Sequence, residues 1–210
     1  MTNPKKNILL TNDDGFDAAG LQALDRALRV DGWNVLVVAP LSERSGAGCS
    51  LSLSNEMKVV ERRDGITLVG YLVDGTPADC VKFATMAVTE FKPDFVLSGI
   101  NRGMNAGNSV FYSGTVAGAI EATLFGFPAM ACSLACWGYP EAFYDDAARV
   151  VTRLLPWLIA QPNMERTLWN MNIPNRRYEE LGRVRLTSHG TSFFVDEFEQ
   201  FKQDANARYF

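Results

Sequence analysis

Short apolar runs that alternate with helix-like segments restrict the fold of this chain more than any other feature of its sequence. The clearest runs are residues 7–11, 34–39, 94–98 and 128–134. The first three are followed by Asn12, Pro40 and Gly99, respectively. Such runs are typical of short buried strands. Residues 18–30 repeat leucine and alanine at helical spacing between the first two runs. Strands of this kind alternating with helices predict a three-layer α/β fold around a largely parallel sheet.

The other predicted elements complete this arrangement. Thr76 is a candidate N-cap, and Pro77 suits the first position of the helix that follows. The remaining predictions are a β-hairpin from 57–61 and 67–73, helices over 76–91, 115–125 and 141–159 (interrupted near Pro156), strands at 168–172 and 184–188, and a tail 193–210 without clear periodicity.

The composition restricts the class of protein. A length of 210 residues with 47% hydrophobic content suits one domain with an appended arm, and a net charge of -4 gives no reason to expect a nucleic-acid polymer or a membrane as partner. No apolar run approaches the roughly 18 residues of a membrane span, and the N-terminal residues lack the pattern of a signal peptide. We therefore expect a cytoplasmic location.

Cysteine and histidine content excludes several kinds of site. Cys49, Cys80, Cys132 and Cys136 form no C-x-x-C pair, which argues against a zinc ribbon or a thioredoxin-like site. No cysteine is followed six residues later by arginine, as in a cysteine-based phosphatase loop. His189 is the single histidine, so a histidine-rich metal site is excluded.

Polar or glycine-rich sequence follows three of the predicted strands. The first strand ends in Asn12-Asp13-Asp14-Gly15, the second leads into a loop containing residues 44–48, and the third leads into residues 98–108. Ligands bind beyond the carboxyl ends of the strands in parallel sheets. We therefore expect these three segments to meet at one edge of the sheet.

The donor atoms in these segments indicate a hard metal ion. Asp13 and Asp14 supply anionic oxygens, Ser45 a hydroxyl and Asn101 an amide oxygen. An all-oxygen set favours Mg²⁺, Mn²⁺ or Ca²⁺. Glycines in the loops let main-chain N–H groups approach an anion, and residues 113–115 at a helix start form a second anion site. A metal beside anion donors is suited to phosphoryl transfer to water.

Simpler interpretations exist for each feature taken alone. Adjacent aspartates before a helix are often turn or cap residues, and Gly46-x-Gly48 does not complete a dinucleotide-binding fingerprint. Asn101 and Asn105 could be turn residues. Arg44 and Arg102 could be solvated or could contact phosphate. His189 is expected to be structural.

Several segments taken together resemble one family, SurE, whose members are metal-dependent nucleoside monophosphate phosphatases. The resemblance spans nearly the whole chain in the expected order. The matching segments are residues 9–15, 19–21, 38–40, 44–47, 75–81, 98–101 (with Gly103, Asn105 and Gly107), 112–116, 170–174 and 190–191.

The resemblance implies a Rossmann-like core with one divalent metal ion, Mg²⁺ or Mn²⁺. It puts the metal ligands at Asp13, Asp14, Ser45 and Asn101. It surrounds them with Asn105, Ser113, Gly114 and Thr115 as substrate- or phosphate-binding residues, and Gly46 and Arg44 of the second loop are further candidates for phosphate binding. The implied reaction is that of a 5′/3′-nucleotidase, which hydrolyses nucleoside 5′- and 3′-monophosphates to nucleoside and phosphate and in some members also trims short polyphosphate. A metal-positioned water would attack, with Asp13 or Asp14 assisting proton transfer.

The resemblance also implies a homodimer or homotetramer. Residues 1–190 are predicted to form the nucleotidase domain, and residues 191–210 the start of a projecting arm or hairpin. The family usually continues beyond this point, so we expect the C-terminal part to be absent here.

Two alternatives to a metal-dependent nucleotidase stay open. One is a nucleotide- or metal-binding protein with little or no turnover, because the C-terminal part is absent. The other is a phosphatase with a covalent aspartyl intermediate, but that class spaces its aspartates by one residue, and Asp13 and Asp14 are adjacent.

Overall fold

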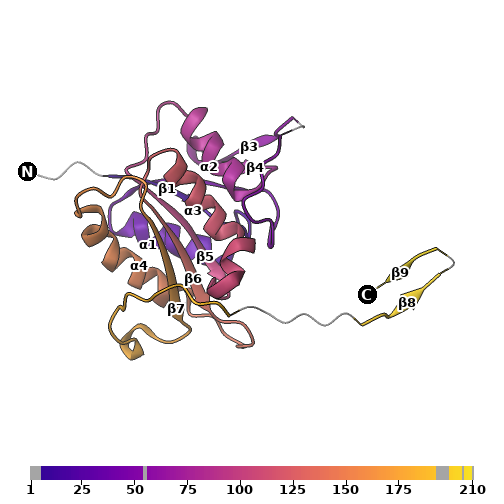
Figure 1. Ribbon diagram of the computed structural model, residues 1–210. Helices are drawn as coiled ribbons and strands as arrows, with labels where there is room; N and C mark the ends of the chain where they lie inside the picture. Colours follow the sequence, from indigo (N-terminus) through magenta and orange to yellow (C-terminus); the bar gives the residue numbers. More distant parts are fainter. Residues whose placement is uncertain (1–5, 54–55, 193–198, 205, 210) are drawn as a thin grey trace, which may run out of the picture.

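The computed structural model describes residues 6–53, 56–192, 199–204 and 206–209 (Figure 1). Its helices and strands are β1 (Asn7–Thr11), α1 (Ala19–Val30), β2 (Asn34–Pro40), β3 (Val59–Asp64), β4 (Thr67–Val73), α2 (Pro77–Met86), β5 (Phe95–Arg102), α3 (Gly114–Leu124), β6 (Ala129–Ala135), α4 (Tyr144–Ile159), β7 (Leu168–Pro174), β8 (Lys202–Gln203) and β9 (Arg208–Tyr209), with short 3₁₀ helices η1 (Gly107–Tyr112) and η2 (Tyr178–Glu180).

A seven-stranded sheet in the order β3-β4-β2-β1-β5-β6-β7 forms the centre of the molecule. All neighbouring strands are parallel except β3 and β4, which form the predicted antiparallel hairpin. The chain passes from β1 to β2 on one side and later from β5 to β6 on the other. The order therefore reverses between β1 and β5, and such a switch point is where ligands bind in open α/β sheets.

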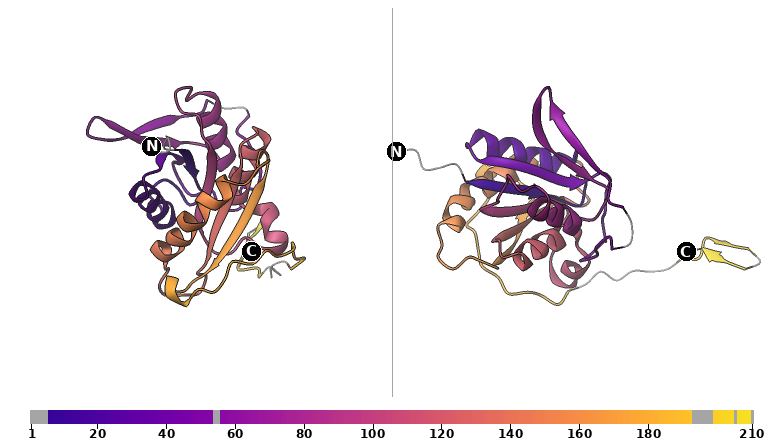
Figure 2. Two further views of the ribbon diagram at one scale, coloured as in Figure 1. Left: turned by 90° about the vertical axis from the view of Figure 1, so that its left-hand side faces the viewer. Right: turned by 90° about the horizontal axis from the view of Figure 1, so that it is seen from above.

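Two helical layers cover the sheet, one on each face (Figures 1 and 2). Ile8 and Leu10 of β1 pack in one core with α1 and α4, while Leu9 packs in the other with α2 and α3. The three side chains are fully buried, as expected for a central parallel strand that is apolar on both faces. The predicted three-layer, Rossmann-like α/β fold is confirmed.

Close packing of α1 on the sheet depends on a glycine. A Cβ atom at Gly20 would lie 2.0 Å from the carbonyl oxygen of Ile100. The first turn of α1 therefore lies directly against the bulged part of β5, which brings the loop before α1 close to the end of β5.

Several predicted boundaries were wrong. Helix α2 ends at Met86 and not near Phe91, because β-branched Val88 and Thr89 favour helix weakly and the chain turns here toward β5. Strand β5 continues to Arg102, through residues predicted as loop. Helix α4 begins at Tyr144 and runs without interruption through Pro156, whose ring is exposed while buried leucines on either side hold the helix to the core.

The predicted strand at 184–188 is also wrong. These residues form no strand, and Val184 and Leu186 are 65% and 84% exposed. They leave β7 paired only with β6 among the described residues. The predicted C-terminal hairpin is present as a separate antiparallel pair, β8 and β9 (Figure 1). Part of the predicted arm, residues 193–198, lies outside the described residues. No helix of the described residues is long and apolar enough to span a membrane.

Candidate active site

The three predicted loops meet at the carboxyl ends of β1, β2 and β5. Asp13 and Asp14 follow β1, which pairs with β5 through Thr11 and Ser98. The main-chain N–H of Arg44, just beyond β2, donates to the carbonyl oxygen of Asp13 at 2.7 Å. Segments far apart in the sequence therefore lie together at the switch point of the sheet.

Asp13 is held at the start of α3. Asp13 is only 4% exposed, and its Oδ1 accepts a hydrogen bond from the Thr115 hydroxyl. Burial raises the pKa of the Asp13 carboxyl, and the hydroxyl and main-chain N–H of Thr115 partly oppose this rise. A Cβ atom at Gly114 would lie 2.8 Å from the Cβ of Asp13, so only glycine fits there. Asp13 thus takes up part of the anion site that the sequence predicted at this helix start.

Asp14 has a more open environment. Its Oδ2 accepts from the main-chain N–H of Arg102 at 3.2 Å. Burial and the neighbouring Asp13 raise the pKa of Asp14 to about 6. Asp14 lines two adjoining cavities of about 350 and 390 Å³, which also share Glu43 and Arg102. One carboxylate of the pair is therefore fixed in the protein, and the other faces space that a ligand could enter.

The predicted neutral ligands lie beside this pair. Ser45 lines the second cavity with Asp14, and its hydroxyl donates to the Glu43 carboxylate at 2.7 Å. Asn101 precedes Arg102, and its Nδ2 donates to the Gly103 carbonyl at 2.8 Å, so Oδ1 is the oxygen left for a ligand. The β5–β6 register shifts between Ser98 and Asn101, so β5 is irregular just before Asn101, which pairs with Ser133 of β6.

A divalent cation suits these residues. Among the ion pairs of the described residues, none includes Asp13 or Asp14. Burial raises the pKa of both carboxyls, and for Asp14 the neighbouring Asp13 raises it further, so a nearby cation would stabilise their charged forms. The part of the chain that the structure describes holds no group of three or more His, Cys, Asp or Glu arranged for a metal. The predicted ligand set contains only two such residues, Asp13 and Asp14, and its other donors are the neutral oxygens of Ser45 and Asn101.

Unpartnered polar atoms are concentrated at the same strand ends. Thr11 Oγ1, Asn12 Oδ1 and Ser98 Oγ are buried without a hydrogen-bond partner among the described residues. Buried polar atoms are normally paired, because an unpaired one costs about 1–3 kcal/mol. Strand ends of this kind are tolerated where water, an ion or a ligand supplies the missing partners.

The other predicted phosphate contacts have mixed surroundings. Ser113 caps α3, where its Oγ accepts from the Val116 N–H at 3.1 Å. Arg44 forms an ion pair with Asp74 at 2.7 Å and is directed there. Gly46 has φ +75°, a conformation that favours glycine. Asn105 follows β5, and side chains from β6 and β7 hold it. A role in phosphate binding stays a prediction for all of them.

Glu43 and Tyr144 are among the cavity-lining residues that sequence reasoning missed. Glu43 immediately precedes Arg44, so its place in the second loop could have indicated that it lies near Asp14. Tyr144 reaches the same cavity from the first residue of α4, and no local sequence signal indicates this contact.

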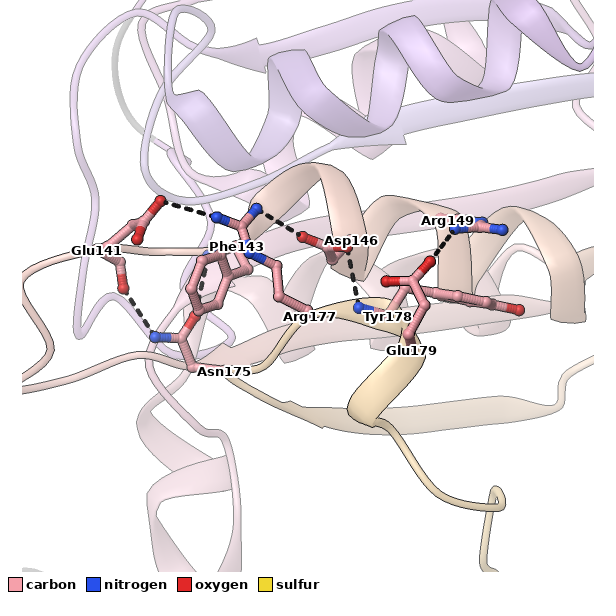
Figure 3. Close-up of polar contacts among 8 residues, drawn as sticks. All are labelled: Glu141, Phe143, Asp146, Arg149, Asn175, Arg177, Tyr178 and Glu179. Carbon is pink, nitrogen blue, oxygen red and sulfur yellow. Dashed lines mark hydrogen bonds and ion pairs between the residues drawn. The ribbon is translucent and has the colours of Figure 1, made fainter.

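A polar network fixes the start of α4 (Figure 3), and with it one wall of the cavity of about 350 Å³. Asn175 accepts from the Phe143 N–H at 2.9 Å and donates to the Glu141 carbonyl at 2.8 Å. Arg177 lies over the Phe143 ring at 4.2 Å from its centroid, within reach of both Glu141 and Asp146. The segment after β7 thus supplies the contacts that the N-terminus of α4 lacks, because Phe143 makes no side-chain cap.

Comparison with known proteins identifies the family. The model of the family "Survival protein SurE" matches residues 8–196. The chain belongs to the SurE family. The predicted resemblance is therefore confirmed.

Individual SurE proteins agree with this assignment. A protein named 5′-nucleotidase SurE from Pelobacter propionicus is 45% identical over 90% of this chain and 74% of its own length. Another of the same name from Rubrobacter xylanophilus is 43% identical, with 96% of this chain and 78% of its own length covered. The crystal structure of the SurE protein from Aquifex aeolicus matches with a TM-score of 0.79 at 40% identity, over 88% of this chain and 72% of that one.

Proposed function

We propose that this SurE protein is a divalent-metal-dependent phosphomonoesterase that hydrolyses nucleoside monophosphates to nucleoside and phosphate. The proposal extends to both 5′- and 3′-monophosphates and to short polyphosphate. Mg²⁺ or Mn²⁺ is the proposed metal, since both accept an all-oxygen ligand set.

The observation that carries the proposal is the environment of Asp13 and Asp14. Asp13 is buried and Asp14 is half-buried beside it at the switch point of the sheet, and no described cationic side chain forms an ion pair with either of them. A site that keeps two carboxylates in this condition is suited to a divalent cation. The names of the relatives, 5′-nucleotidase SurE, support the choice of nucleoside monophosphates as substrates.

The residues divide the work according to their surroundings. Asp13, Asp14, Ser45 and Asn101 would hold the metal, which when bound would neutralise the carboxylates and polarise a phosphate oxygen. The main-chain N–H of Gly114 and the Asn105 amide are the candidate phosphate donors on the α3 side. Asp14 faces the cavities, so it is the carboxylate that a water molecule can reach and to which a proton can pass.

Hydrolysis assays with purified protein test the proposal. Release of phosphate from 5′- and 3′-nucleoside monophosphates should require Mg²⁺ or Mn²⁺, stop with chelator and fail in Asp13→Asn. Turnover that is insensitive to chelator, or that persists in Asp13→Asn, would refute a metal-dependent mechanism. Calorimetric binding of Mn²⁺ or nucleotide without any turnover would favour the binding-protein alternative. We also propose a homodimer or homotetramer, which light scattering measures directly.

A further inference from the structure

A cluster of amide side chains surrounds Asn105, which the proposed function makes a substrate contact. The Asn172 Oδ1 accepts from the Asn105 N–H at 2.8 Å, and its Nδ2 donates to the Asn105 carbonyl oxygen at 2.9 Å. One side chain thus pairs with both main-chain polar groups of Asn105, in the way that a neighbouring strand residue would. The Asn170 Nδ2 donates to the same carbonyl oxygen at 2.8 Å, which fills both of its lone pairs.

The side chain of Asn105 is oriented by a different contact. Its Nδ2 donates to Ser133 Oγ at 2.9 Å, and Asn105 is only 6% exposed. This leaves the second N–H of the amide and Oδ1, for which no hydrogen bond with the described residues is formed. The free N–H is the kind of donor that a phosphate oxygen accepts, and the Ser133 contact fixes its direction.

The three supporting residues belong to one face of the sheet. Asn170 and Asn172 are two residues apart on β7 and so point to the same side, and Ser133 of β6 is the register partner of Asn172. Earlier on the same face, Ala129, Ala131 and Leu168 pack with α3. The face therefore changes from apolar to polar toward the carboxyl ends of β6 and β7, where Asn105 lies.

We propose that Ser133, Asn170 and Asn172 are positioning residues that act on the reaction through Asn105. Asn170 and Asn172 set the main chain of Asn105, and Ser133 sets the direction of its side-chain amide. The inference rests on the proposed function, because it takes Asn105 as a contact to the phosphate. It also gives a role to the Asn170-Met171-Asn172 segment, to which sequence reasoning assigned none.

A double-mutant cycle separates positioning from a merely structural contribution. Ser133→Ala should lower kcat/KM for a nucleoside monophosphate about tenfold in the wild-type background. In the Asn105→Ala background the same change should lower kcat/KM less than about twofold, because Ser133 affects the substrate only through the Asn105 side chain. Ser133→Thr keeps the hydroxyl and should restore most of the loss. An equal cost in both backgrounds, or no cost in either, would overturn the proposal for Ser133.

Hydrogen exchange tests the main-chain part without any assay of activity. Asn172→Ala removes both side-chain partners of the Asn105 main chain and should raise exchange at residues 104–106 at least about tenfold. Asn175→Ala is the matched control, since Asn175 makes the same paired contact with residues 141 and 143 just after β7. It should affect only residues 141–143. Unchanged exchange at 104–106 in Asn172→Ala would overturn the proposal. Raised exchange in a protein whose wild type hydrolyses no nucleotide would support the positioning of Asn105 while refuting the proposed function.

Discussion

Asp13 and Asp14 are adjacent in the sequence but lie in different surroundings. Asp13 is buried against the start of α3 and is held by Thr115. Asp14 receives a single main-chain hydrogen bond and faces the cavities between the second loop and α4. The difference indicates two roles. The side of the site at the start of α3 (the α3 side) holds Asp13 in place, and the side where Asp14 faces the cavities (the cavity side) leaves room for reactants.

Replacement of either carboxylate should have the largest effect on activity. Asp13→Asn and Asp14→Asn each remove one anionic ligand, and each should lower kcat at saturating Mn²⁺ by about 100-fold or more. The two variants should differ in Mn²⁺ affinity. Asp13→Asn should bind Mn²⁺ more weakly than Asp14→Asn, because the Asp13 carboxylate is the more firmly held of the two. Initial-rate assays over a range of Mn²⁺ concentrations measure both quantities. Equal metal dependence in the two variants would remove the proposed distinction.

The stability of the metal-free protein should depend on pH through this pair. Asp14 has a folded pKa of about 6 against an ordinary value of 3.8, so the folded state binds more protons between these values. Stability from this group is therefore greatest below about pH 4 and decreases as pH rises toward 6, by up to about 2–3 kcal/mol. The pKa of Asp79 is lowered in the folded protein, so its contribution to stability is instead lost as the pH falls into the acid range.

The difference between wild type and Asp14→Asn isolates this contribution. Urea unfolding in chelator should show the wild type losing stability relative to Asp14→Asn between pH 4 and 7. Mn²⁺ should reverse the loss at neutral pH, because a ligand that binds only the folded state stabilises it. A difference that does not vary with pH would contradict the raised pKa of Asp14.

Gly114 tests how tightly the α3 side is built. In Gly114→Ala the added methyl group meets Asp13 at under 3 Å, so the carboxylate or the helix start must move. We expect a loss of about 1–3 kcal/mol in stability and a clear drop in metal affinity. Gly182→Ala is the control, since a Cβ there meets no atom within 4 Å. Wild-type Mn²⁺ binding in Gly114→Ala would show that the α3 side is not rigid.

Asn175 should give the smallest of these effects on the site. Asn175→Ala leaves the Phe143 N–H and the Glu141 carbonyl without their partner, which should cost about 1–2 kcal/mol in thermal unfolding. Its contacts lie beyond the cavity wall and not at the carboxylates, so Mn²⁺ affinity should change less than about threefold. A metal-binding loss as large as that in Gly114→Ala would mean that both sides of the site are equally constrained.

Sequence reasoning succeeded where the signal is local. The apolar run ending in Asn12-Asp13-Asp14-Gly15 predicted both β1 and the paired carboxylates, because the strand and its polar end are contiguous. The helix start at Thr76 follows from capping chemistry, and Thr76 caps α2 here. The parallel order of the strands then predicted which loops come together.

Sequence reasoning failed where a contact joins distant parts of the chain. The partners of Asn105 lie up to 67 residues away, and nothing near Asn105 indicates them. Tyr144 reaches the cavity only because α4 packs beside α1. The 184–188 run has strand-like composition, but a strand forms only where it pairs with a neighbour, and this run pairs with none of the described strands.

Calorimetric titration of Mn²⁺ into chelator-treated protein tests the central claim most directly. The claim is that Asp13 and Asp14 form the charged half of a single metal site. The wild type should bind about one Mn²⁺ per chain, and Asp13→Asn should bind at least about 100-fold more weakly under the same conditions. A wild type that binds no Mn²⁺, or an Asp13→Asn variant that binds it with unchanged affinity, would contradict the account.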